Sequence, residues 1–286
     1  MQNLRKILEK TFVIDVEHHA SIGSTNDRAI QCAAPERVKL PLLIITDCQT
    51  AGRGRGSNRW WTGPGSLAFS LLIGPEPPST VGMPATGGCV GWASQPVQKE
   101  SPSTVGMPAT GGRRSGLVAL AAGVAVVEAL APWVPGHEIG IHWPNDVMLD
   151  GRKLAGILIE VLSDGKLVIG IGINTNNTAT DAPEEVRPRV VTLRDVTGRS
   201  HDHVELLISI LCQLQRQLAA LSVSPESVAA RTHELCLQRG KRLQIVQGEK
   251  PIEGRCLGIA TDGAMLLEID GKPQMVYSGV VTLVEG

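Results

Sequence analysis

The stretch that decides the fold is residues 143–173, WPNDVMLDGRKLAGILIEVLSDGKLVIGIGI. Two Asp-Gly pairs, Asp150–Gly151 and Asp164–Gly165, separate runs of apolar residues within it. An Asp-Gly pair between apolar runs is typical of a tight turn that joins two strands, because glycine accepts a positive φ without strain. The pattern predicts a hairpin around Asp150–Gly151, with strands at Val147–Leu149, Leu154–Leu162 and Lys166–Ile173.

Further strands and helices flank this stretch. Apolar runs bounded by turn residues predict short buried strands at Pro41–Thr46, Ser66–Ile73 and Gly140–Trp143. The Ala- and Leu-rich segment Leu117–Leu130 predicts a buried helix, and leucines at helical spacing predict another over Val204–Leu218. We therefore expect a mixed α/β (α+β) domain in which helices flank a mixed β-sheet.

The end of the chain has a different pattern. Short strands are predicted at Lys241–Gln247, Ile252–Ala260, Ala264–Ile269 and Gln274–Val284, and Asp-Gly turns separate the last three. Several short strands joined by tight turns are typical of a small β-barrel. We place a domain boundary near residue 236, which gives a main domain at 1–235 and a barrel domain at 236–286.

Residues 74–115 form a Gly- and Pro-rich segment within the main domain. The string PSTVGMPATGG occurs in it twice, at 78–88 and at 102–112. Two copies do not make a repeat protein, which needs about three or more. Because glycine and proline at this density interrupt both helices and strands, we expect an insertion that is disordered or loosely packed.

The composition narrows the class of protein. The chain has 27 Lys and Arg against 28 Asp and Glu, a net charge of −1, which argues against a protein that coats nucleic acid. No signal-peptide pattern opens the chain, and no apolar run approaches the about 20 residues of a membrane-spanning helix. We expect a cytoplasmic protein without membrane contact. Its cysteines show no CxxC pattern, so neither disulfides nor a zinc site is implied.

The strongest chemical signal is the segment Gln49–Trp61, QTAGRGRGSNRWW. Its glycines let a ligand approach the backbone, and Arg53 and Arg55 offer planar cations that bind phosphate or carboxylate oxygens. The segment lacks the GK[ST] ending of a P-loop, and Ser57 replaces the third glycine of a dinucleotide-binding loop. The pattern favours an anion-binding loop that becomes ordered when its ligand arrives. A basic surface turn and an RNA-binding Arg/Gly segment are the alternatives.

Three other segments carry candidate site residues, each with a plainer structural alternative. Lys153 begins an apolar, Gly-containing strand, where it can direct one charge into a pocket or can be a solvated hairpin lysine. Gly170 and Gly172 share one face of a strand, which leaves room for a flat ligand or for close packing under a helix. The segment Ser24–Thr25–Asn26 by itself is typical of a helix N-cap.

Taken together and in this order, these segments resemble the biotin protein ligase family. Its pattern includes an STN segment (here 24–26), a QTAGRGR…W loop (49–60), a WPND…KLAGIL segment (143–158), a GIGIN strand (170–174) and a C-terminal SH3-like barrel. The resemblance covers the chain except for the 74–115 insertion. It implies a ligase that forms a carbon–nitrogen bond. Biotin and ATP would give biotinyl-5′-AMP, and a lysine of biotin carboxyl carrier protein would then accept the biotin.

The resemblance also implies roles for individual residues. Arg53, Arg55 and Lys153 would be catalytic, because they would hold the biotin carboxylate and the α-phosphate and stabilise charge between them. The biotin site would comprise Ser24, Thr25, Gln49, Arg53, Arg55, Lys153, Gly156, Gly170 and Gly172. The nucleotide site would comprise Arg55, Trp60, Asn145, Asp146, Lys153 and Asn174. Asp146 would be the candidate ligand of the Mg²⁺ that accompanies ATP.

The chain departs from the family pattern at residue 142 and at its N-terminal end. His142 stands where the family usually has a lysine, so we expect a positive charge to be missing there at pH 7. The STN segment begins at residue 24, too early for the N-terminal winged helix-turn-helix with which some members repress transcription, so we expect no direct DNA binding. The alternative functions are a lipoate-type acyl ligase and a non-catalytic module that binds biotin or a nucleotide, disabled by the insertion. The chain is expected to be a monomer or a homodimer.

Overall fold

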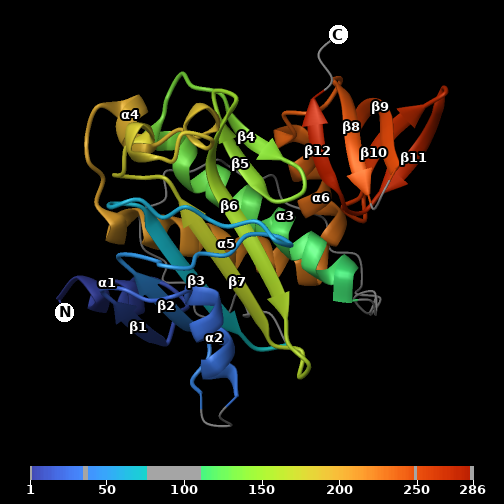
Figure 1. The fold of residues 1–286 in the computed structure, drawn as a ribbon. Helices are drawn as coiled ribbons and strands as arrows, with labels where there is room; N and C mark the ends of the chain where they lie inside the picture. The colour runs from blue at the N-terminus through green and yellow to red at the C-terminus, as the bar shows by residue number, and fades with distance from the viewer. Residues whose placement is uncertain (1, 35–37, 76–110, 248–249, 284–286) are drawn as a thin grey trace.

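The computed structural model describes residues 2–34, 38–75, 111–247 and 250–283. Seven strands among these residues form one sheet in the order β1-β2-β3-β7-β6-β5-β4 (Figure 1). The strands β1 and β2 are parallel and the other neighbouring pairs are antiparallel, so the sheet is mixed as predicted. The strands are β1 (Asp15–His19), β2 (Leu42–Thr46), β3 (Leu67–Ile73), β4 (Ile139–His142), β5 (Asp146–Leu149), β6 (Arg152–Val161) and β7 (Leu167–Ile173).

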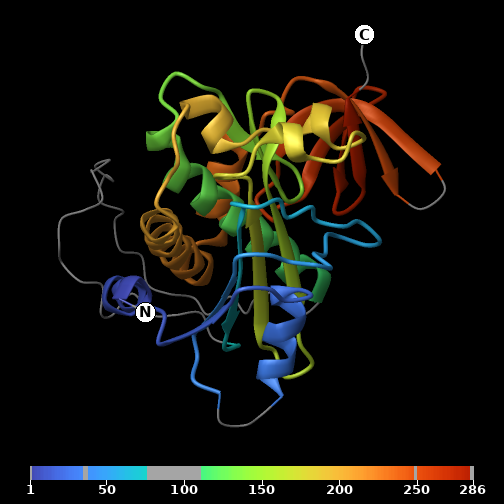
Figure 2. The same cartoon turned by 60° about the vertical axis from the view of Figure 1, so that its left-hand side comes forward.

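Helices cover both faces of this sheet (Figures 1 and 2). On one face α3 packs against α5, with α1 and α6 beside them, and α2 covers the other face. The helices are α1 (Gln2–Lys10), α2 (Thr25–Ala33), α3 (Gly111–Leu130), α4 (Leu193–Thr197), α5 (His203–Val223) and α6 (Pro225–Leu235). Short 3₁₀ turns occur at Ala131–Trp133, Ala179–Asp181 and Arg187–Arg189.

The alternation of side chains along each strand divides the core in two. Leu43 and Leu71 belong to the core cluster shared with α3 and α5, whereas Ile44 and Leu72, one residue further on, pack under α2. Every residue of β2 and β3 is buried for this reason. Strands covered on both faces have continuous apolar sequences, which is why the sequence pattern located them.

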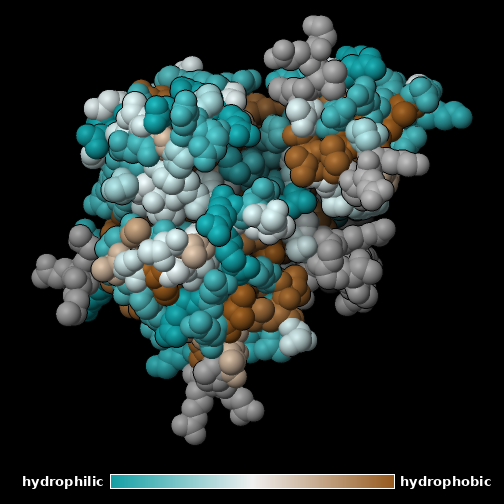
Figure 3. Space-filling view, in the orientation of Figure 1, coloured by the Kyte–Doolittle hydropathy of each residue, from teal (hydrophilic) through white to brown (hydrophobic). Residues whose placement is uncertain are grey.

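A second sheet is formed near the end of the chain, in the order β11-β10-β9-β8-β12, with antiparallel neighbours throughout. Its interior includes Leu243, Ile245 and Met265, together with Leu120 of α3 and Trp143 next to β4. On its outside Figure 3 shows a hydrophobic patch, and exposed apolar residues there include Val246 and Val280. The strands are β8 (Arg242–Gln247), β9 (Lys250–Ile259), β10 (Met265–Ile269), β11 (Lys272–Val276) and β12 (Val280–Leu283).

The structure corrects two sequence-based boundaries. The single strand expected at Gln274–Val284 is two strands. The extended conformation is interrupted next to Gly279, whose φ of +145° is rarely adopted by residues with a side chain. The helix expected from Leu117 begins at Gly111, so residues 111–115 are helical and not part of a disordered insertion. The expectation of disorder for residues 76–110 concerns a segment outside the described residues.

The expectation that no apolar stretch approaches the length of a membrane-spanning helix needs correction for two helices. Ser115–Trp133 and His203–Val223 each have the length and composition of a membrane-spanning helix. Their apolar side chains are nevertheless used inside the protein: Val124 of α3 and Leu214 of α5 are fully buried in the main core. The core helices of a soluble protein pass the same test of length and hydropathy.

Candidate active site

The Arg/Gly segment forms a hairpin-like loop between β2 and β3. The Trp60 N–H donates to the Gly52 carbonyl at 3.0 Å, and the Gly54 N–H donates to the Asn58 carbonyl at 2.8 Å. At the tip, Gly56 has a φ of +61°, a left-handed conformation that glycine adopts without strain. Backbone hydrogen bonds therefore give this loop a defined shape and hold Trp60 at its base.

Two glycines open the face of the sheet beneath the loop. Gly156 of β6 lies directly opposite Gly172 of β7, and such partners share one face. The Trp60 indole lies against both, since a Cβ at Gly172 would come within 2.4 Å of its Cε2 and a Cβ at Gly156 within 3.0 Å of its Cζ3. Among the described residues the buried Trp60 Nε1 has no hydrogen-bond partner. The two glycines thus form a flat surface, and Trp60 covers it.

Lys153 reaches this surface from the start of β6. Its Nζ lies 2.7 Å from Asp146 Oδ1 and 5.6 Å from the centroid of the Trp60 ring, within the range of a cation–π contact. The Asn174 amide donates to the Lys153 carbonyl at 3.3 Å, which ties the end of β7 to the same strand. Lys153 therefore places a single charge over the glycine surface, with its side chain 32% exposed.

Arg53 is held by two carboxylates. Its Nη2 lies 2.6 Å from Glu160 Oε2 and 2.8 Å from Asp27 Oδ1. Burial by itself lowers the pKa of Arg53, but its hydrogen bonds with Glu160 and Asp27 and their negative charges raise the pKa above the ordinary value. Arg55 makes a weaker contact, in which Nη1 donates to Asn145 Oδ1 at 3.4 Å. Both arginines are therefore bound to groups that the carboxylate or phosphate of a ligand can replace.

The STN segment begins α2 beside this loop. Ser24 occupies the N-cap position in an extended conformation, although its side chain makes no capping hydrogen bond within the described part of the chain. Thr25 donates from its N–H and its hydroxyl to Gln49 Oε1, at 2.9 and 3.1 Å. Ser70 Oγ of β3 lies 2.7 Å from Thr25 Oγ1 and 2.6 Å from Asn26 Oδ1. These contacts fix α2 and Gln49 relative to the sheet.

The structure brings most of the predicted site residues together. Eight of them lie around the start of β6 and the end of β7: Arg55, Trp60, Lys153, Asn145, Asp146, Gly156, Gly172 and Asn174. Arg53 is bound at Glu160, towards the other end of β6, and Thr25 with Gln49 lies at the start of α2. Gly170 differs from this group, because a Cβ there would lie 1.9 Å from Asn26 Oδ1. The space at Gly170 is therefore filled by a protein side chain in this structure, where the sequence analysis expected room for a ligand.

The sequence analysis missed the acids that hold Arg53. Besides binding Arg53, Glu160 Oε2 accepts from Asn26 Nδ2 at 2.8 Å, so one carboxylate joins the loop to α2. Glu160 follows Gly156 by four residues on the same strand, and this even spacing places both on one face. That relation was available in the sequence. The pairing of Asp27 with Arg53 had no such signal, because it depends on how the loop folds back over α2.

His142 lies at the end of β4, in register with Asp146 of β5. Burial is the main cause that lowers the pKa of His142, Asp146 opposes this shift, and the positive charges of Lys153 and Lys241 add to it. The imidazole is therefore neutral at pH 7. The direction of this pKa shift agrees with the expectation that residue 142 carries no positive charge at pH 7.

The described residues contain no group of three or more His, Cys, Asp or Glu side chains placed to hold a metal ion. Nucleotide-bound Mg²⁺ is commonly held by one or two carboxylates together with the phosphates, and it keeps several of its waters. Asp146 and the amide oxygen of Asn145 offer donors of this kind beside Lys153 and Arg55. The site thus fits a Mg²⁺ that arrives with a nucleotide better than a permanent metal centre.

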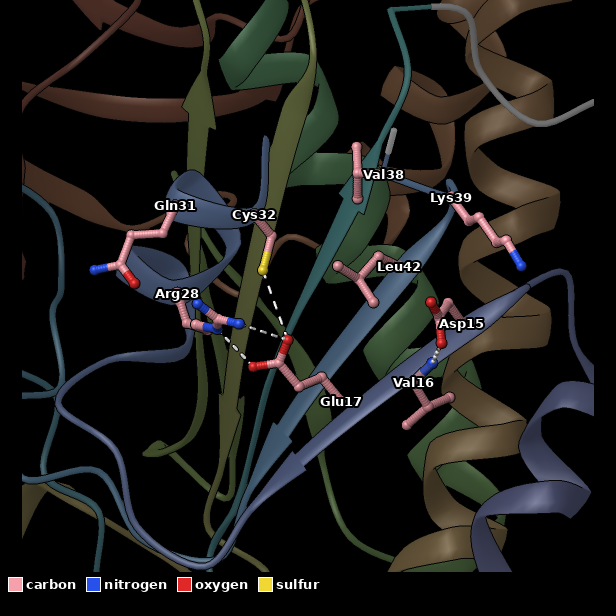
Figure 4. Close-up of a pocket in the computed structure, with 9 residues that line it drawn as sticks. All are labelled: Asp15, Val16, Glu17, Arg28, Gln31, Cys32, Val38, Lys39 and Leu42. Carbon is pink, nitrogen blue, oxygen red and sulfur yellow. Dashed lines mark hydrogen bonds and ion pairs between the residues drawn. The ribbon is translucent and has the colours of Figure 1, made fainter. Parts of the chain in front are cut away.

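A separate hollow of about 540 Å³ lies between α2, the edge strand β1 and its neighbour β2 (Figure 4). The centre of this hollow is an ion pair, in which Arg28 donates to Glu17 from Nε at 2.5 Å and from Nη2 at 3.1 Å. Cys32 Sγ lies 3.6 Å from the same carboxylate, and burial raises the pKa of its thiol. None of the predicted site residues lines this hollow.

Comparisons with known proteins agree with this geometry. The model of the Biotin/lipoate A/B protein ligase family matches residues 20–91 and 108–176. The biotin–[acetyl-CoA-carboxylase] ligase of Mycobacterium tuberculosis is 30% identical over 265 residues, which cover 92% of this chain and 86% of the relative. The ligase of the same name from Paracoccus denitrificans is 27% identical, over 92% and 98% of the two chains. The solved biotin protein ligase of Aquifex aeolicus, in complex with biotin and ATP, superposes with a TM-score of 0.73 at 25% identity, over 96% of this chain and all of that one.

Proposed function

The chain belongs to the biotin protein ligase family, and from this premise we propose that it attaches biotin to a lysine of a biotin carboxyl carrier protein. A carboxylate oxygen of biotin attacks the α-phosphorus of ATP, which forms biotinyl-5′-AMP and breaks the bond to the leaving pyrophosphate. The neutral amine of the acceptor lysine then attacks the acyl carbon. The amide bond forms, AMP leaves, and the amine proton passes to solvent.

The observation that supports this proposal is a glycine-lined surface with Lys153 over it and two arginines held on the neighbouring loop. Both partners of the first step are anions, so the site must offset their repulsion while holding them within bonding distance. Lys153 supplies positive charge over Gly156, and Arg55 supplies it beside Asn145. Arg53 supplies it at Glu160, four residues further along β6. The chemistry requires no protein nucleophile, because both attacking groups come from the substrates.

The biotin half of the site is proposed to lie towards α2. Thr25 and Gln49 supply hydrogen-bonding groups there, Ser24 begins the helix beside them, and Gly156 with Gly172 forms the floor. The floor is covered by Trp60 in this structure, so Trp60 moves aside when biotin enters and closes over the ligand afterwards. In the bound state the biotin carboxylate takes up contacts with Arg53 and Lys153.

The nucleotide half is proposed to lie towards β5. Arg55 and Asn174 flank this side, and Asp146 with Asn145 would hold the Mg²⁺ that accompanies ATP. When bound, that ion supplies additional positive charge against the phosphates. Asp146, which is paired with Lys153 in this structure, would then hold the ion, and Lys153 would be free to contact the reacting oxygens.

The setting of the reaction is part of the proposal. We infer a soluble enzyme of the cytoplasm, because the two helices apolar enough for a membrane use that surface in the core. We also propose that residues 1–235 form the catalytic domain and 236–286 an SH3-like domain, supported by the separate antiparallel sheet that starts at Arg242. The acceptor is a carrier domain that presents its lysine to the open side of the site.

The test is transfer of biotin to an isolated acceptor carrier domain with ATP and Mg²⁺. We expect labelling by the wild type and a loss of about a hundredfold or more for Lys153→Ala, because preorganised charge at the reacting centre is removed. Lys166→Ala is the matched control, since Lys166 also pairs with an aspartate but lies in the turn before β7.

The other outcomes separate the alternatives. Formation of biotinyl-5′-AMP without transfer would indicate an unsuitable carrier domain. Transfer of lipoate in preference to biotin would favour the lipoate-type ligase. Binding of biotin or ATP without adenylate would leave a non-catalytic binding module and contradict the proposed function.

A further inference from the structure

The segment that leads from α6 to β8 runs along the end of β4. Leu237 donates from its N–H to the Ile141 carbonyl at 3.0 Å, and Cys236 pairs with Ile141 as a parallel bridge. The next residue, Gln238, is 1% exposed although its side chain is polar. A buried amide of this kind is stable only when its donors and acceptor are used, so its contacts show what it holds.

The Gln238 amide holds the backbone of Trp143 from both sides. Its Oε1 accepts from the Trp143 N–H at 2.6 Å, and its Nε2 lies 3.4 Å from the Trp143 carbonyl oxygen. The same Nε2 lies 3.3 Å from His142 Nε2. Because an amide nitrogen is only a donor, that contact requires His142 Nε2 to be the acceptor, which fits a neutral imidazole.

The side chain of Trp143 is fixed by the C-terminal sheet. Its indole is 2% exposed and packs with Leu243, Ile245 and Met265, and its Nε1 donates to the Gly263 carbonyl at 3.1 Å. Trp143 is thus held through its backbone by Gln238 and through its ring by the second sheet. The residue has little freedom to shift while both attachments are intact.

Trp143 is followed directly by the candidate nucleotide residues. Asn145 contacts Arg55 through Oδ1 at 3.4 Å and donates from Nδ2 to the Ile157 carbonyl at 2.8 Å, and Asp146 forms the ion pair with Lys153. Any displacement of Trp143 is carried through one proline to these two side chains. We propose that Gln238 is a positioning residue for the nucleotide half of the site, an inference that rests on the function proposed above.

The inference predicts a selective defect. Gln238→Met keeps the volume of the side chain and removes its hydrogen bonds, so the fold is retained while Trp143 is released. We expect the affinity for α,β-methylene-ATP, which cannot lose pyrophosphate, to fall by about tenfold or more, as is typical when a supporting hydrogen bond behind a ligand-binding group is removed. The affinity for biotin, measured by calorimetry on the same preparation, is expected to change less than about twofold, because the hydrogen bonds of Thr25 and Gln49 described above do not involve Gln238.

Two further variants sharpen the comparison. Gln238→Glu keeps an acceptor for the Trp143 N–H but turns a carboxylate oxygen towards the Trp143 carbonyl, so its loss of ATP-analogue affinity is expected to be at least as large as that of Gln238→Met. Gln244→Ala is the matched control, because Gln244 lies on β8 and its side chain donates to Glu253 of the same sheet at 2.9 Å. It is expected to bind both ligands as the wild type does.

The outcomes decide the inference separately from the proposed function. Equal loss of both affinities in Gln238→Met, in step with a lower Tm, would show a merely structural role and overturn the proposal. Unchanged affinity for the ATP analogue would overturn it as well. If the wild type binds both ligands but transfers no biotin, the proposed function fails, and the analogue titration still decides whether Gln238 positions the nucleotide site.

Discussion

Lys153 shows how the site keeps its charges without a ligand. Its ammonium group is paired with Asp146, and the side chains of the two residues are 32% and 25% exposed. An ion pair that remains partly in water contributes about 0–1 kcal/mol, so exchanging it for a substrate carboxylate or phosphate costs little. The same holds for Arg53 and its partner Asp27, whose side chain is 51% exposed. Carboxylates of the protein thus occupy positions that the substrate anions can take over.

The glycines beneath Trp60 lead to a graded prediction. A Cβ at Gly172 would meet the indole at 2.4 Å, whereas one at Gly156 would meet it at 3.0 Å. Overpacking of this kind costs roughly 1–3 kcal/mol, which corresponds to about a ten- to hundredfold change in affinity. We therefore expect Gly172→Ala to weaken biotin binding more than Gly156→Ala does, as measured by calorimetry.

Gly123→Ala provides the control for these two variants. An added Cβ there would lie 3.5 Å from Ile141 Cδ1, an ordinary contact, and alanine favours the helix by up to about 1 kcal/mol over glycine. Its Tm should equal or exceed that of the wild type, with biotin affinity unchanged. Wild-type biotin affinity in Gly172→Ala would show that this face of the sheet is not the biotin floor.

At the scale of elements, the sequence predicted the parts whose pattern is local. Asp150 and Gly151 have φ values of +48° and +74°, the two positive values that a two-residue hairpin turn of this type requires. The Asp-Gly pair in the sequence predicted that turn. The strand β1 was missed because it lies at the sheet edge and its sequence, DVEHH, is polar. The helix α6 was missed for a similar reason, since only Val228, Ala229 and Thr232 of it are buried. An element that shows most of its surface to water leaves a weak apolar pattern.

The residues of the candidate site also divide into those with a local sequence pattern and those without one. Lys153, Gly156 and Gly172 lie in strands with strong patterns, and the family resemblance assigned their roles. Glu160 and Gln238 act through contacts with residues that are 107 and 95 positions away in the chain, and no spacing in one sequence encodes such contacts. The position of the motif residues in their strands was predictable, whereas the long-range contacts that hold the motif in place were not.

At the scale of elements, we predict that ligands protect the Arg/Gly loop from proteolysis. Its arginines are held by half-exposed ion pairs and a long hydrogen bond, which allow local opening. When biotin and ATP bind, new contacts to Arg53 and Arg55 should suppress that opening. We expect cleavage by trypsin after these arginines to slow by about tenfold or more with both ligands present, as a bound ligand shifts the equilibrium towards the closed state. The fragments can be assigned by mass spectrometry.

Cleavage after Arg199 is the internal reference for that experiment, because Arg199 is exposed and lies in the turn after α4. Its rate should not depend on the ligands. Equal rates at Arg53 and Arg55 with and without biotin plus ATP would contradict the idea that the ligands order this loop.

At the scale of the whole molecule, the interior of the second sheet includes side chains from the part of the chain that forms the first sheet and its helices. Leu120 of α3 and Trp143 beside β4 are fully buried in its interior, next to Met265. A composition change near residue 236 indicates where the pattern of the chain changes, but it says nothing about which side chains cross between the two sheets. The shared interior was therefore outside the reach of the sequence and became visible only in the packing.

A shared interior predicts that both sheets unfold together. Trp143→Ala removes a large side chain from that interior, and truncations of this kind cost about 3–5 kcal/mol. Because Trp143 is also tied to β4, the loss should lower the stability of both sheets, seen as one calorimetric transition displaced to lower temperature. Val223→Ala, at a residue that is 87% exposed, is the control and should stay within about 0.5 kcal/mol of the wild type. Two separate calorimetric transitions, with only one shifted to lower temperature by Trp143→Ala, would mean that the two sheets unfold independently. The hydrogen bonds of Gln238 would then connect two parts of the protein that unfold separately.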